Sequence, residues 1–376
     1  MNARATPTLD EALAAIVGIG PPDEGAMAAA RAHLDRLTKP PGSLGRLEEL
    51  VIALAGISGQ AHPSMDRRAI VVAAGDHGVA GQGVSAYPSE VTAQMVANFV
   101  GGGAAINVLA DVASASLTVV DVGVASAIPD VAIADSRGGH LITARIRPGT
   151  ADMTEGPAMA RSEALRAIDI GLEVIDDLQA SGIDVVSLGD MGIGNTTAAS
   201  AISAVMTGTP PVLVTGRGTG IDDAAHGRKV ATIERALARN APDAADPVGV
   251  LAAVGGLEIA ALVGVILGAT AARVPVILDG FISGAAALIA TGLAPTVAGR
   301  VIAAHRSAEP GHAIVLERLG LRPLLDLDLR LGEGTGAALA IQLIDAALRL
   351  RDGMATFASA GVSGPAVGDL HVKTPT

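Results

Sequence analysis

Apolar residues follow two different patterns along this chain. The first 60 residues look helical in three segments, TLDEALAAIVGIG, DEGAMAAARAHLDRL and GSLGRLEELVIALAGISG, and the second of these has its apolar residues at helical spacing. Pro-Pro-Gly at 40–42 breaks the chain before the third segment, where Ser43 is the expected N-cap. The sequence therefore predicts helices at the N-terminal end.

From about residue 68, short β-branched runs alternate with glycine-rich loops and alanine-rich helical segments. Most of these runs are apolar throughout, which is typical of strands in a parallel sheet with both faces covered. Strand, loop and helix in repetition favour right-handed crossovers and a doubly wound, mainly parallel α/β sheet. The expected strands are RAIVVAAG, SLTVVDVG, GIDVVSLG, PVLVTG, VPVILDG, RVIAAH and LLDLDLRLG.

One apolar stretch, residues 248–272, is long enough to span a bilayer. It is rich in Gly and Ala, carries Glu258 in its middle, and lacks aromatic or basic flanks. We therefore expect a buried helix or helix pair, with a break at Gly255 and Gly256.

Composition limits the function classes. The 376 residues carry a net charge of −12 and no cysteine. The acidic balance disfavours nucleic acid and anionic membranes as partners, and the absence of cysteine excludes disulfides and thiolate chemistry. The N-terminal residues place acids before any apolar core, unlike a signal peptide, so a cytoplasmic location is expected.

Ligands of doubly wound sheets bind beyond the carboxyl ends of the strands, so the loops after the strands are the place to look for function. These loops are rich in glycine, hydroxyl groups and charge. They are GDHGVAGQGVSAYPSE (75–90), GDMGIGNTT (189–197), GRGTGIDD (216–223), DGFISGAA (279–286), HRSAEPGH (305–312) and GEGTGA (332–337).

The loop 189–197 is a candidate phosphate site. A strand, a glycine loop and a helix follow one another here, and N–H groups at a helix start bind anions. Gly192 and Gly194 would let a phosphate approach the main chain, and Thr196 or Thr197 could cap the helix. The glycine order is neither a dinucleotide fingerprint nor a Walker loop. A tight structural turn is the alternative.

Other polar residues give weaker signals. Lys229 could reach a phosphate as a point charge, and Ser307 adds a small donor after another strand. Asp222 and Asp223 lie in the wrong order for a pyrophosphate-sugar site, and no G-x-S-x-G elbow is present. The histidines His77, His305 and His312 lack metal-ligand spacing and are expected to be polar loop residues.

Glu333 stands between two glycines at the end of an apolar run. An unpaired buried carboxylate is costly, and flanking glycines permit a sharp turn or the close approach of a ligand. Glu333 is thus either a carboxylate presented to a pocket or an acid at the start of the helix that follows.

Several of these loops resemble the nicotinate-nucleotide–dimethylbenzimidazole phosphoribosyltransferase family. KPPGSLGRLEEL, AAGDHGV, GVSAYPSEVTAQMVANFVGGGAAINVLA, GDMGIGNTT, DGFISGAAALIA, HRSAEPGH and LRLGEGTGA occur in family order from about residue 39 to 340. The resemblance implies transfer of ribose phosphate from nicotinate mononucleotide to 5,6-dimethylbenzimidazole with inversion, in cobalamin assembly. It also implies a homodimer that needs no cofactor.

The resemblance further implies a domain division and residue roles. A small helical lobe would comprise 1–62 and 335–360, beside a Rossmann-like domain at 63–334 and a flexible tail at 361–376. Glu333 would be the catalytic base. Base-binding positions would be Ala86, Gln94, Met191 and Leu331, and nucleotide-binding positions Asp190, Gly192, Gly194, Asn195, Lys229 and Ser307. Asp190 stands where the family more often has glutamate, and Ala86 where other members carry a hydroxyl.

Two other functions remain open at this point. A non-catalytic regulator could bind nucleotide phosphate on the same loops, and a related transferase could use another azole or a purine. An NAD-dependent dehydrogenase would need the dinucleotide fingerprint that the sequence lacks.

Overall fold

The structure is a computed structural model that describes residues 7–130 and 137–364. Contacts divide the chain into two units, the first comprising residues 1–22 and 65–342 and the second residues 23–64 and 343–376. The second boundary falls inside helix α14 (Thr335–Gly353). Part of the expected tail, residues 365–376, lies outside the described residues.

The large unit contains a six-stranded sheet of order β3-β2-β1-β4-β5-β6, with every pair parallel. This is the doubly wound order in which the direction of winding reverses between β1 and β4. The expected α/β fold is confirmed. The strands are β1 (Arg68–Gly75), β2 (Ala115–Gly123), β3 (His140–Thr143), β4 (Val185–Met191), β5 (Val276–Leu278) and β6 (Val301–Ala303).

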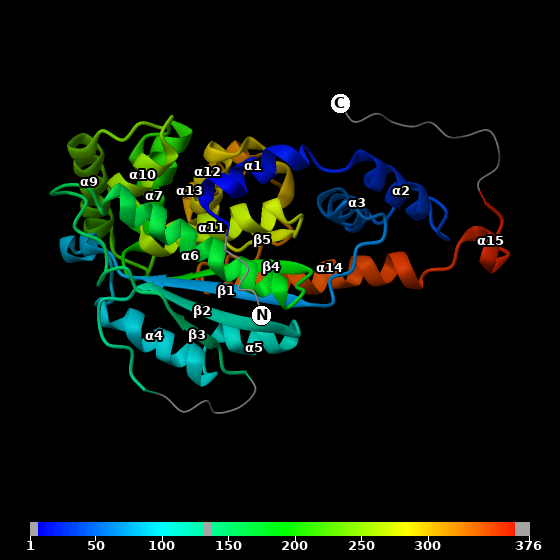
Figure 1. The fold of residues 1–376 in the computed structure, drawn as a ribbon, viewed down its shortest axis with the longest axis horizontal. Coiled ribbons are helices and arrows are strands. Elements are labelled where there is room, and N and C mark those ends of the chain that lie inside the picture. Colours follow the sequence, from blue (N-terminus) through cyan, green and yellow to red (C-terminus); the bar gives the residue numbers. More distant parts are fainter. Residues whose placement is uncertain (1–6, 131–136, 365–376) are drawn as a thin grey trace. The chain divides into compact units, whose positions relative to one another are not determined.

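Helices cover both faces of this sheet (Figure 1). On one face, α4 (Glu90–Gly101) and α5 (Ala105–Val112) pack with apolar side chains of β1 and β2. On the other, α6 (Arg161–Ala180) and α11 (Leu257–Ala271) build the main core together with α12 (Phe281–Leu293). The large unit also contains α1 (Leu9–Ile19), α7 (Asn195–Thr207), α8 (Pro211–Val214), α9 (Asp223–Asn240), α10 (Pro247–Val254), α13 (Pro310–Leu319) and the 3-10 turns Gly78–Gln82 and Pro295–Arg300.

The small unit holds α2 (Glu24–Leu34), α3 (Arg46–Ser58), the later part of α14 and α15 (Phe357–Ala360). A buried ion pair of 2.8 Å joins Lys39 to Glu48, and an isolated bridge pairs Leu37 with Thr356. Helix α1 belongs to the large unit, since it contributes Ala12 and Ile16 to the main core, whereas the family resemblance implied that it belongs to the small lobe.

The long apolar stretch is confirmed as a buried helix pair. Gly255 and Gly256 separate α10 from α11, and α11 is buried along nearly its whole length. Among the described residues, Glu90–Val112 has the length and apolar composition of a membrane span. In the structure this stretch is α4 and α5, separated by a break after Gly101.

Two expected strands and one expected cap are wrong. Residues 211–214 form α8, with proline at its first turn. Residues 324–332 contribute only a single bridge from Leu325 to His305. Ser43 does not cap α3, whose N-cap is Gly45 without a side-chain hydrogen bond.

Two glycines allow α6 and α11 to pack closely. A Cβ added at Gly264 would lie 2.0 Å from the carbonyl oxygen of Ile168, and one at Gly171 would lie 2.0 Å from that of Ala261. Real atoms cannot approach so closely, so the helices would have to move apart.

We expect Gly264→Ala to destabilise the protein by about 1–3 kcal/mol, the usual cost of overpacking a core. Gly227, within α9, has open space around it. Gly227→Ala should therefore stabilise the protein by roughly 0.5–1 kcal/mol through helix propensity. Urea unfolding of both variants tests this, and equal midpoints would contradict the packing argument.

Candidate active site at the carboxyl edge of the sheet

Buried polar side chains meet at the carboxyl edge of the sheet. Asp76 follows β1, Asp190 lies near the end of β4, Asp279 follows β5 and His305 follows β6, and all four are buried. The winding reverses between β1 and β4, which opens a crevice for ligands at this edge. The fold therefore places the candidate site here.

Glu333 lies at this edge in an unusual backbone conformation. Gly332, Glu333 and Gly334 have φ values of 81°, 63° and 90°. A non-glycine residue in the left-handed region costs roughly 1–2 kcal/mol, and such strain often marks functional positions. The glycine at 189 is required too, because a Cβ there would lie 2.4 Å from the Glu333 carbonyl oxygen.

The Glu333 carboxyl group is buried yet only partly satisfied. The residue is 5% exposed, and its Oε2 has no hydrogen-bond partner among the described residues. Burial raises the pKa of this carboxyl group, against a smaller lowering by the main chain of Ile106. A carboxylate with a free oxygen and a raised pKa is suited to accept a proton.

Asp190 lies beside Glu333. Its carbonyl oxygen accepts the Glu333 N–H at 3.2 Å, and its Oδ2 accepts from Asn195 Nδ2 at 2.9 Å. Burial raises the pKa of Asp190 well above its usual value, and the charges of Asp279, Glu258 and Glu333 raise it further. The neighbouring carboxyl groups thus disfavour the ionised form of Asp190.

The loop 189–197 is built for close contact. A Cβ on Gly192 would lie 2.2 Å from the Gly75 carbonyl oxygen, and Gly194 has a φ of 98° at the N-cap of α7. The expected cap by Thr196 or Thr197 is wrong, since Gly194 is the cap and Thr196 instead accepts a hydrogen bond from Lys229. The first N–H groups of α7 thus begin at this edge.

Lys229 reaches this loop from α9. It is fully buried, and its Nζ donates to Thr196 Oγ1 at 2.7 Å. Burial lowers the pKa of Lys229 to about 8, although the negative charge of Glu309 acts to raise it. A buried cation at a helix N-terminus is well placed for a phosphate.

Glu309, which no sequence motif had marked, organises the loop beside Lys229. Its Oε1 accepts the Gly218 N–H at 2.8 Å, while Arg330 donates to the Gly218 carbonyl oxygen at 3.2 Å. Ser307, from the same loop as Glu309, is buried, and its Oγ accepts the Glu309 N–H at 3.3 Å. Only the charge and hydroxyl content of HRSAEPGH pointed to this loop.

The expected base-binding residues are more open. Ala86, Gln94 and Leu331 are exposed, and Met191 is half-buried at the end of β4. The Ala86 N–H donates to Thr219 Oγ1 at 3.0 Å, which ties this segment to the loop of Gly218. No hydrogen bond or ion pair in the described parts of the chain connects Gln94 or Leu331 to Glu333.

Of the three histidines expected in polar loops, His77 and His305 lie in loops, whereas His312 lies within α13, and all three are buried. His77 Nε2 lies 2.7 Å from Glu258 Oε1, and His312 Nδ1 accepts the Ser307 N–H at 2.9 Å. Burial lowers the pKa of His312 to about 3. Within residues 7–130 and 137–364, no three acidic or histidine side chains are arranged to hold a metal ion.

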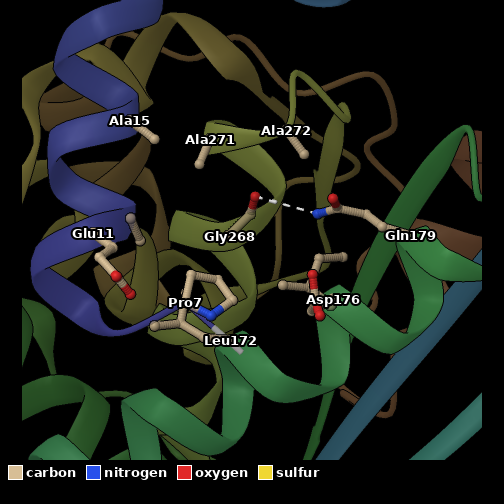
Figure 2. Close-up of a pocket in the computed structure, with 11 residues that line it drawn as sticks. Pro7, Glu11, Ala15, Leu172, Asp176, Gln179, Gly268, Ala271 and Ala272 are labelled. Atoms are coloured by element: carbon tan, nitrogen blue, oxygen red, sulfur yellow. Dashed lines mark hydrogen bonds between the residues drawn. The ribbon is translucent and has the colours of Figure 1, made fainter. Parts of the chain in front are cut away.

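A separate cavity of about 390 Å³ lies between α1, α6 and α11 (Figure 2). Its lining includes Glu11, Asp176 and Gln179 but no basic residue. On α11 the cavity is lined by Gly268 and Ala271, whereas Glu258 lies at the opposite end of that helix. At a rise of 1.5 Å per residue, Gly268 is about 15 Å from Glu258 along the helix axis. This cavity is therefore distinct from the carboxyl-edge site and poorly suited to a phosphate.

Comparisons with known proteins identify the family of this chain. Residues 19–362 match the family described as Phosphoribosyltransferase. A nicotinate-nucleotide–dimethylbenzimidazole phosphoribosyltransferase of Chloroflexus aggregans is 57% identical over 345 residues, 92% of this chain and 96% of that protein. The enzyme of the same name from Desulforudis audaxviator is 56% identical over 346 residues, 92% of this chain and 96% of the relative.

A solved structure gives the same result. The nicotinate-nucleotide–dimethylbenzimidazole phosphoribosyltransferase of Thermus thermophilus superimposes with a TM-score of 0.84 at 48% identity. The match covers 91% of this chain and 100% of the Thermus thermophilus chain. In sequence and in fold, this chain belongs to the nicotinate-nucleotide–dimethylbenzimidazole phosphoribosyltransferase family.

Proposed function

We propose that this protein transfers the 5-phosphoribosyl group of nicotinate mononucleotide to 5,6-dimethylbenzimidazole, giving α-ribazole 5′-phosphate and nicotinate in cobalamin assembly. The observation that carries the proposal is the buried Glu333 carboxyl group with a free Oε2, at the same sheet edge as Lys229 and the loop 189–197. The names of its relatives give the same reaction.

The chemistry requires little more than a base and a phosphate site. Nicotinate leaves from an N-glycosylated pyridinium, so the breaking C–N bond returns its electron pair to a ring nitrogen that needs no acid. One benzimidazole nitrogen forms the new bond to the ribose carbon from the opposite face, which inverts the β-nucleotide to an α-riboside. The other nitrogen then loses its proton to Glu333, since a nearby base of suitable pKa accelerates such a step.

Binding of the nucleotide is assigned to the residues around Lys229. In this proposal Lys229 and Ser307 hold the phosphate and ribose, together with the main chain at Gly192, Gly194 and Asn195. Asp190, hydrogen-bonded to Asn195, lies beside the nucleotide with a shorter arm than glutamate would give. Ala86, Gln94, Met191 and Leu331 would surround the benzimidazole.

The direct test is incubation with nicotinate mononucleotide and 5,6-dimethylbenzimidazole, followed by chromatography of the products. We expect release of nicotinate only when the benzimidazole is present, with formation of one α-riboside phosphate. Tight binding of the nucleotide without consumption would instead identify a regulator. Turnover with adenine but not with benzimidazoles would identify a related transferase.

Residue 86 is expected to tune the choice of base. Ala86→Val adds two methyl groups and should change the ratio of kcat/KM between dimethylbenzimidazole and unsubstituted benzimidazole, because even one methyl-sized change in an apolar pocket is worth about 1–3 kcal/mol. Competition between the two bases measures this ratio. Ala244→Val, at an exposed position on the loop before α10, is the control. Unchanged selectivity in Ala86→Val would show that residue 86 does not line the base pocket.

We also propose a cytoplasmic homodimer, and the family resemblance supports the dimer. Light scattering after size exclusion measures the oligomeric state, and a monomeric mass would contradict the dimer.

A further inference from the structure

Asp279 caps a helix that starts on another segment of the chain. Its Oδ1 accepts the Ala337 N–H at 3.0 Å, in the first turn of α14. Main-chain hydrogen bonds from Gly334 and Gly336 to the same carboxyl group also lower its pKa, although burial raises it overall, to about 7. The N–H groups at a helix start lack hydrogen-bond partners within the helix, so a carboxylate there supplies the missing acceptor.

Glycine at 336 and the fold around β5 and β6 make this contact possible. Asp279 directly follows β5 and is 1% exposed. His305, after β6, places Nε2 3.7 Å from Asp279 Oδ1. A Cβ at residue 336 would lie 2.0 Å from His305 Cδ2, so only glycine lets the start of α14 lie against these side chains.

This cap changes what Glu333 can do. A glutamate just before a helix commonly turns toward the free N–H groups of the first turn. Here those groups face Asp279, and the negative charge of Glu333 further raises the pKa of Asp279. Glu333 instead keeps a left-handed backbone with Oε2 free of hydrogen bonds from the described residues.

We propose that Asp279 is a positioning residue: by occupying the N-terminus of α14, it keeps the carboxyl group of Glu333 turned away from the helix and available to the substrate. The proposal deepens the function above and rests on Glu333 as the base. Without the Asp279 carboxylate, the N–H groups of the first turn would lack this partner and would draw the Glu333 carboxylate out of its catalytic position.

The test uses two variants, Asp279→Ala and Asp279→Asn. The asparagine has nearly the same shape as aspartate, so this variant keeps the test valid if Asp279→Ala does not fold. We expect kcat to fall by about tenfold or more, up to the roughly 10²- to 10⁴-fold loss of a missing general base, with a nearly unchanged KM for the nucleotide. In a double-mutant cycle, Asp279→Ala should cause no further loss of kcat in a Glu333→Gln background, because residues that act as a unit are not additive.

Asp246→Ala is the control matched to Asp279→Ala, since Asp246 caps α10 through the Gly249 N–H at 3.1 Å, outside the site. It should lower the melting temperature without changing kcat. A folded Asp279 variant with wild-type kcat, or losses that multiply in the cycle, would overturn the proposal while leaving Glu333 as the base. Wild-type kcat in Glu333→Gln would overturn both, and no nicotinate release by the wild type would refute the proposed function itself.

Discussion

Replacing Glu333 by glutamine is expected to lower kcat by about 10²- to 10⁴-fold, the usual contribution of a general base. Glutamine keeps the size of the side chain and can still hydrogen-bond, but it cannot accept the benzimidazole proton. Nucleotide affinity should stay nearly unchanged, because Lys229 and the loop 189–197 are intact. Steady-state kinetics with nicotinate mononucleotide, together with calorimetry of nucleotide binding, measure both quantities.

The pH dependence separates this role from a structural one. Burial raises the pKa of Glu333, and a base works only when deprotonated, so kcat/KM should fall as the pH drops through that raised pKa. The glutamine variant should lack this acid limb. Since the benzimidazole also protonates in acid, both enzymes must be compared with the same acceptor. A folded Glu333→Gln enzyme with wild-type kcat would show that Glu333 is not the base and is only an acidic residue at the start of a helix.

Local patterns predicted the parts of the fold that depend on burial. Continuous apolar runs gave β1, β2, β4, β5 and β6, because strands covered on both faces must be apolar throughout. The same rule failed at 211–214, where a proline-started apolar run forms a short helix with Val212 and Leu213 exposed. It also missed β3, an edge strand whose His140 and Thr143 are exposed.

Short glycine motifs drew attention to Glu333 and Gly192, and the structure places both at the carboxyl edge of the sheet, while their roles stay predictions. Contacts between distant segments could not be predicted. Asp279 contacts Ala337 and Glu309 contacts Gly218, and only the fold brings these residues together. His77 likewise has its hydrogen-bond partner, Glu258, on a helix 181 residues later, so no local pattern predicted its burial.

Removal of the Lys229 cation should weaken nucleotide binding more than any other single change in the phosphate site. A hydrogen bond to a charged group is worth about 1.5–3 kcal/mol, which corresponds to roughly a 10- to 150-fold rise in Kd. Lys229→Met keeps the length of the buried stem while removing the charge, and Lys229→Ala removes both. Arg228→Ala deletes an equal charge from the exposed neighbouring position and should bind nucleotide nearly as the wild type does.

The pH dependence of nucleotide binding gives Lys229 a second, independent test. Burial lowers its pKa to about 8, so in the free protein the cation is lost as the pH rises through that value. A nucleotide phosphate is already a dianion there, since its second pKa is about 6. Nucleotide Kd in the wild type should therefore rise between about pH 7 and 9, while Lys229→Met should show no such rise. Benzimidazole binding should change little in either protein, because no charge on that ligand faces Lys229. Two results would show that Lys229 does not bind the phosphate. One is calorimetry in which the Lys229 variants bind both ligands equally more weakly. The other is the same pH profile of nucleotide binding in the wild type and in Lys229→Met.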